Sequence, residues 1–223
     1  MKNTLILTSM TAALMSLSSQ AAVIINPTTI TYTGTGVEFF TDETHLIDGS
    51  GLSEPVTVAN VGTVTHASVG SGNAWVTNDP GAGGGDYFAE SGDATIVFEV
   101  TFDQAYSVTD FVNWAYGFGT VNDNNISSVT FDYGVGNFDS STGPIAIAEA
   151  SSGGASVITS LGGITADRIR LTVTDNHYIP VGGDGGDRLG LAELRFVGTA
   201  VPEPSTTGLI GLAGLAFILR RRR

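Results

Sequence analysis

Hydrophobic and polar residues alternate along most of the chain, and this alternation predicts β-strands. One face of the segment "ATIVFEVTF" carries Ile96, Phe98, Val100 and Phe102. A period of two is expected of a strand that buries one face and exposes the other. The segment "DRIRLTVTD", residues 167–175, repeats the pattern.

Further segments have the composition of strands and are separated by runs of glycine, aspartate and asparagine that favour turns. They are residues 28–34, 55–61, 63–69, 108–118, 127–136, 144–150, 155–161 and 191–198. Between the two ends of the chain, no apolar stripe keeps helical spacing for three turns. The sequence therefore predicts an all-β fold, an antiparallel β-sandwich of the jelly-roll type.

The first 22 residues, "MKNTLILTSMTAALMSLSSQAA", have the order of a secretory signal peptide. Lys2 precedes a short apolar run, and small residues follow it. We expect signal peptidase to cut near Ala21 or Ala22, which leaves residues 23–200 as an exported domain. The alternative interpretation is a buried N-terminal helix.

The last residues, "VPEPSTTGLIGLAGLAFILRRRR", combine three features in order. These are the motif Pro202, Glu203 and Pro204, the apolar run 206–219, and the cluster Arg220, Arg221, Arg222 and Arg223. As a helix the run would be about 21 Å long, against a bilayer core of about 30 Å. The arginines would stay on the cytoplasmic side.

This tail resembles the PEP-CTERM sorting signal of Gram-negative bacteria. The resemblance implies transient membrane insertion, then cleavage near the Pro-Glu-Pro motif by an exosortase-type transpeptidase. It also implies delivery to the cell surface or extracellular matrix, where such proteins accompany exopolysaccharide. A simple C-terminal membrane anchor is the alternative.

The body of the chain is strongly acidic. The whole chain has a formal net charge of −13, and the only cations between residues 23 and 200 are Arg168, Arg170, Arg188 and Arg195. Such a surface repels phosphate backbones, so we expect no nucleic-acid binding. With no cysteine in the chain, stability must come from a core, a bound metal or both. About 175 residues suffice for one core, so we expect one domain.

The body also resembles the galactose-binding-like jelly roll of discoidin, or coagulation factor type C, domains and related carbohydrate-binding modules. The resemblance rests on segments that stand in the family's order. They are "HLIDGSGLS" (residues 45–53), Trp75, residues 96–117, "DRIRLTVTD" (residues 167–175) and "LAELRFVG" (residues 191–198). One departure is the stretch 54–74 before Trp75, which we interpret as an inserted hairpin near the ligand-binding loops.

The same resemblance implies a structural calcium ion between the early loop and the last strand. Its ligands would be Asp48, the carbonyl of Ser50, Ser53 and Glu193. Calcium accepts about six to eight oxygens of mixed kind, so this set is chemically reasonable. The alternative is that Asp48 only begins a turn and Glu193 faces solvent.

Binding of a sugar needs an aromatic platform with polar groups beside it. We predict Trp75 and Tyr178, which stand among polar residues, as exposed platforms, with His177 as a polar partner. Trp114 lies within an apolar segment and is expected in the core.

Three functions remain open from the sequence. The first is non-catalytic binding of carbohydrate, such as exopolysaccharide, and the second is a structural or adhesive matrix component without a ligand pocket. A polysaccharide hydrolase is third, because the chain has no motif of a known catalytic site and no cysteine for a thiol mechanism. We therefore expect that the protein is not an enzyme.

Overall fold

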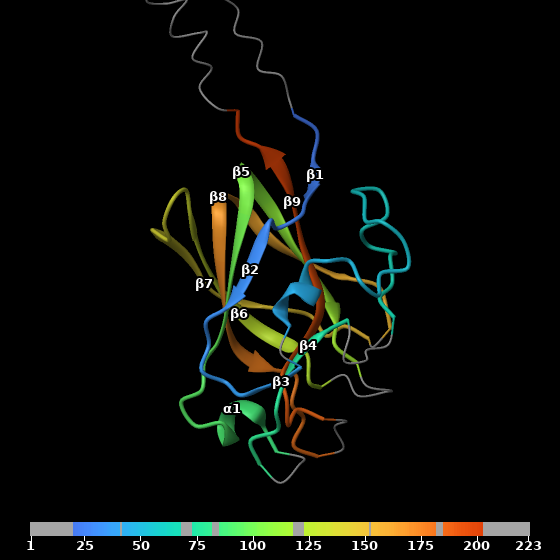
Figure 1. Ribbon diagram of the computed structural model, residues 1–223, viewed down its shortest axis with the longest axis vertical. Coiled ribbons are helices and arrows are strands. Elements are labelled where there is room, and N and C mark those ends of the chain that lie inside the picture. The colour runs from blue at the N-terminus through green and yellow to red at the C-terminus, as the bar shows by residue number, and fades with distance from the viewer. Residues whose placement is uncertain are drawn as a thin grey trace, which may run out of the picture.

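The computed structural model describes residues 20–40, 42–67, 73–81, 85–117, 123–151, 153–181 and 185–202, and it is almost entirely antiparallel β-structure (Figure 1). The elements in chain order are β1 (Val23–Ile25), β2 (Thr29–Tyr32), β3 (Glu38–Phe40), the 3-10 helix η1 (Glu43–Leu46), β4 (Trp75–Thr77), α1 (Tyr87–Glu90), β5 (Ile96–Ala115), β6 (Ile126–Gly134), β7 (Ser140–Ala146), β8 (Val157–Asn176) and β9 (Gly190–Ala200). The all-β prediction is confirmed.

Two strands of 20 residues each, β5 and β8, connect the two layers of the fold. Residues 96–101 of β5 pair with β2 and with the end of β8, whereas residues 106–115 pair with β9 and with the start of β8. The register shifts between Thr101 and Tyr106 and again between Val108 and Asp110, and such irregularities bend a strand. The sequence predicted two separate strands where β5 is continuous.

The core lies between these layers and is rich in aromatic contacts. Phe111, in the second half of β5, packs on Phe131 of β6 with ring centroids 5.2 Å apart. At the other edge, Trp75 of β4 meets Phe98 of β5 edge-on, at 4.7 Å. Because each pair joins strands of different layers, the bent sheet closes on itself as a sandwich.

The stretch before Trp75 folds differently from its prediction as two strands. Residues 57–63 form turns, which Asn60 stabilises by accepting from the backbone N–H of Thr57 at 2.6 Å and donating to the carbonyl of Pro55 at 3.1 Å. Only short bridges remain, such as Leu52 with His66. Local side-chain hydrogen bonds of this kind compete with strand pairing.

This segment, residues 54–67, lies across the outer face of the sheet. Val61 and Val64 pack there in a second hydrophobic cluster with Val112 and Trp114 of β5. The indole Nε1 of Trp114 donates to the carbonyl of Val64 at 2.9 Å, and both groups are buried. The prediction that Trp114 is buried is confirmed, but it belongs to this outer cluster rather than to the main core.

Within the described residues, no helix is long and apolar enough to cross a membrane. Residues 1–19 of the predicted signal peptide (residues 1–22) and the tail after Pro202 lie outside these residues.

We expect Trp114→Phe to lower the free energy of unfolding by about 1–3 kcal/mol, because the buried carbonyl of Val64 loses its donor. Urea denaturation measures this change. Val58→Ala in the same segment is the control, since Val58 is 44% exposed. An equal effect of the two substitutions would contradict a stabilising role of this hydrogen bond.

Candidate functional site

The predicted calcium ligands meet on the outer face of β9. Glu193 and Arg195 stand two residues apart in this strand, so their side chains leave the same face. Both are buried, with exposed fractions of 0% for Glu193 and 5% for Arg195. The loop that carries Asp48 covers them and follows directly after η1.

Glycines allow this loop to turn back onto the strand. The carboxylate of Asp48 accepts from the backbone N–H of Ser50 at 2.6 Å, which closes a tight turn. Gly49 adopts a positive φ of 78°, and its N–H donates to Glu193 Oε2 at 3.1 Å. Asp48 therefore does begin a turn, while Glu193 is buried against that turn and does not face solvent.

Three of the four carboxylate oxygens of Asp48 and Glu193 accept a hydrogen bond from an N–H, and the fourth, Glu193 Oε1, is in an ion pair with Arg195. Asp48 Oδ1 accepts from Ser50, and Oδ2 accepts from Nδ1 of His45 at 3.0 Å. Glu193 Oε2 accepts from Gly49, and Oε1 is paired with Nη1 of Arg195. The two acids are therefore held by nitrogen donors.

Burial dominates the electrostatics of this pair. It raises the pKa of the Glu193 carboxyl and lowers the pKa of the Arg195 guanidinium, and the charge of each partner opposes the other's shift. Burial also acts to raise the pKa of Asp48, but the hydrogen bonds from Ser50 and His45 outweigh it and lower that pKa.

This arrangement does not fit a calcium ion. Calcium requires oxygens that are free to point at one centre. Here a buried guanidinium stands beside Glu193, and Ser53 Oγ accepts from the backbone N–H of Thr65 at 3.2 Å. Ser50 Oγ and Glu193 Oε1 are buried without a hydrogen-bond partner. Among the described residues, no three acids or histidines form a group suited to a metal.

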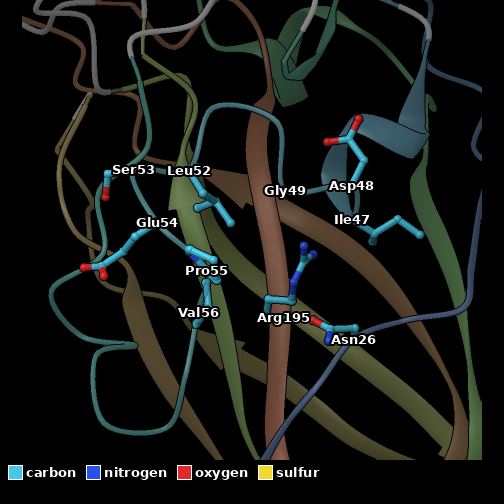
Figure 2. Close-up of a pocket in the computed structure, with 10 residues that line it drawn as sticks. All are labelled: Asn26, Ile47, Asp48, Gly49, Leu52, Ser53, Glu54, Pro55, Val56 and Arg195. Atoms are coloured by element: carbon cyan, nitrogen blue, oxygen red, sulfur yellow. The ribbon is translucent and has the colours of Figure 1, made fainter.

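A groove opens between this junction and residues 52–56, and it encloses about 650 Å³ (Figure 2). Its lining residues are Asn26, Ile47, Asp48, Gly49, Leu52, Ser53, Glu54, Pro55, Val56 and Arg195. In Figure 2 the guanidinium of Arg195 extends from β9 toward Gly49, with the two wall segments on either side. The groove thus combines hydrogen-bonding groups with apolar walls.

The predicted platform residues lie elsewhere. Trp75 has no exposed surface, because it packs against Tyr32 and Phe98 and donates to Glu38 Oε2 at 2.7 Å. The prediction of an exposed platform at Trp75 is therefore wrong, because β4 lies between β3 and β9 and all three of its residues are buried.

His177 and Tyr178 follow the end of β8 and are half-buried. The ring of Tyr178 lies against Gly186, where a Cβ would come within 2.5 Å of it. Neither residue lines the groove. The structure therefore brings together Asp48, Ser53 and Glu193 but separates them from the predicted platform residues.

Sequence reasoning missed Arg195 and Asn26 as parts of this site. The signal for Arg195 was present, since a residue two positions after Glu193 in a strand must share its face. Asn26 follows β1, which pairs with β9 through Ile25 and Phe196, and only this pairing brings it to the groove.

The tail of the chain matches a known sorting motif. Residues 200–223 match the PEP-CTERM protein-sorting motif. The chain carries this sorting signal. The prediction for Pro202, Glu203, Pro204 and the arginines Arg220 to Arg223 is thereby confirmed at the level of sequence, although residues from Glu203 onward lie outside the described part.

Solved structures similar to this chain include sugar-binding domains. The family 32 carbohydrate-binding module of NanJ from C. perfringens, in complex with galactose, is 17% identical, with 79% of this chain and 99% of that chain covered and a TM-score of 0.43. An F5/8 type C domain from Bacteroides fragilis is 11% identical, with coverages of 81% and 98% and a TM-score of 0.47.

The lectin domain of lectinolysin, complexed with Lewis B antigen, is 13% identical, with coverages of 74% and 90% and a TM-score of 0.44. At such identities the likeness extends to the fold alone. No curated protein matches the chain by sequence.

His66 lies against Gly51, in the loop that follows Asp48, and is 2% exposed. Its Nδ1 is 2.8 Å from the carbonyl of Ala67 and donates to it, whereas Nε2 is buried without a partner. Gly51, with a φ of 90°, is required beside it, because a Cβ there would come within 2.5 Å of the His66 ring. Burial lowers the pKa of His66, so the ring is neutral in the folded protein at neutral pH.

We expect acid to destabilise the fold through His66. Below about pH 6.5 the unfolded chain binds a proton at this ring while the folded chain does not, so stability falls as pH falls, by up to about 1.4 kcal/mol per pH unit. Melting temperatures between about pH 7.5 and pH 5.5 measure the slope. His66→Gln should flatten it; a slope in this variant equal to that of the wild type would contradict the prediction.

Proposed function

We propose that the protein is exported to the cell surface or extracellular matrix of a Gram-negative bacterium, where it binds carbohydrate, such as an exopolysaccharide, without catalysis. The sorting motif at residues 200–223 supports export and surface delivery. The order of the motifs in the body supports a galactose-binding-like module. The acidic body favours a neutral polymer over a nucleic acid as partner.

The groove between β9 and residues 52–56 is the proposed binding site, and its mixed lining is the observation that carries the proposal. Asn26 and Glu54 are exposed at its rim and offer an amide and a carboxylate to sugar hydroxyls. Leu52 and Pro55 give an apolar wall for the C–H faces of a sugar ring. Polar groups at fixed places against an apolar wall are the usual features of a small-ligand site.

The charges of the lining favour an uncharged sugar. Asp48 and Glu54 are acidic, whereas the charge of Arg195 is offset by Glu193. A uronic acid would therefore meet net repulsion in this groove. Neutral hexoses are the proposed ligand class.

We expect Asn26→Ala and Glu54→Gln each to weaken binding to a neutral polysaccharide by roughly 2- to 10-fold, since each removes one hydrogen bond. Both residues are exposed, so the fold should be retained. Affinity electrophoresis against a panel of neutral and acidic polysaccharides measures the change.

Tyr178→Ala is the matched control at the far end of β8. Loss of binding in this variant, with binding retained in the groove variants, would move the site to Tyr178 and contradict the groove. Absence of binding to every polysaccharide in the panel would favour a structural matrix component.

For the tail, we propose insertion into the membrane followed by cleavage near Pro202, Glu203 and Pro204 by an exosortase-type transpeptidase. The expected intact mass of the exported protein lacks residues 206–223, as well as the signal peptide. Mass spectrometry of the cell-surface fraction measures it. An exported protein that still contains Arg223 would indicate a permanent anchor instead.

A further inference from the structure

The Glu193–Arg195 pair, within β9, is unlike a second glutamate–arginine ion pair of the described residues, which joins two strands. Arg170 of β8 and Glu99 of β5 also form an ion pair, at 2.8 Å, but their side chains are 36% and 30% exposed. Glu193 and Arg195 have 0% and 7% of their side chains exposed. Water screens the first pair and cannot screen the second, so the second pair has structural consequences that the first lacks.

The loop and the last strand are joined through this buried pair. Glu193 contacts Gly49 with one oxygen and Arg195 with the other. Asp48 lies close enough to act electrostatically on both side chains. The buried guanidinium is thus paired with the acid of the strand, whereas the acid of the loop is paired with His45.

We propose that the guanidinium of Arg195 is the cation of this junction. The 48–53 loop is then joined to β9 without a metal ion. The sequence resemblance assigned that task to calcium, with Asp48 and Glu193 as ligands. The guanidinium supplies the positive charge that the buried acid Glu193 requires, and it does so from within the chain. This inference does not depend on what the groove binds.

The guanidinium of Arg195 is held beside Glu193 by a contact with its own strand. Nη1 donates to the carbonyl of Leu194 at 2.8 Å and forms the ion pair with Glu193. The side chain extends along its own strand, so no loop has to close around it. A fixed planar donor set suits a carboxylate better than a mobile ammonium group does.

A divalent cation would compete poorly at this place. To reach Glu193 it would have to displace a buried guanidinium and the N–H of Gly49. The displaced charge would then lie next to the new ion, which like-charge repulsion disfavours. The junction should therefore be indifferent to both calcium and chelator.

The test is the melting temperature of the full chain, without glycan, in millimolar calcium and in excess chelator. We expect the same value in both conditions. Arg195→Met should lower it by at least about 6 °C, because the buried acid loses its counter-charge. Arg170→Met, in the exposed pair, is the matched control and should change it far less.

A second variant separates charge from packing. Glu193→Gln combined with Arg195→Met removes both charges and should recover part of the loss, even where Arg195→Met alone fails to fold. A rise in the melting temperature of the wild type with calcium would overturn the proposal. So would a loss in Arg195→Met no greater than in Arg170→Met, or one that Glu193→Gln does not relieve. Because no glycan is present, failure here leaves the proposed function untouched, and the converse also holds.

Discussion

Glu193 has no exposed surface, and a buried carboxylate must be given partners. The arrangement around the groove follows from this requirement. One partner is the N–H of Gly49, which fixes the loop on the strand, and the other is the guanidinium of Arg195, which forms the floor of the groove. A single buried acid thus sets the position of both a wall and a floor of the candidate site.

The long strands provide the frame that holds this acid in place. β5 belongs to both layers, and its second half pairs with β9 through Trp114 and Glu193. On the same outer face, Trp114 holds residues 54–67 by its hydrogen bond to Val64. Residues 54–56 of this segment wall the groove, and Trp114, which holds the segment, pairs with Glu193, which holds the loop. The groove and the second hydrophobic cluster therefore depend on the same two neighbouring strands.

The period of two predicted the strands around Phe98 and Leu171 and the all-β class, because alternation reports directly on burial. It could not predict the continuity of β5, which depends on register shifts near Tyr106, or the turns near Asn60, which depend on local side-chain bonds. For the site, Asp48 and Glu193 were correctly placed together. The calcium ion predicted between them stays a prediction, and the ion pair of Glu193 with Arg195 was not predicted.

The pairing of β1 with β9 places the start and the end of the described domain side by side. Val23, which follows the predicted signal-peptide cleavage, lies opposite Gly198, which precedes the sorting motif. Asn26 at the groove comes directly after β1, whereas Tyr178 follows the distant end of β8. If the tail holds the protein at the membrane before cleavage, the groove lies nearer to the tethered end than Tyr178 does. Release from the tail would then increase the access of a large polysaccharide to the groove more than to the far end of the sandwich.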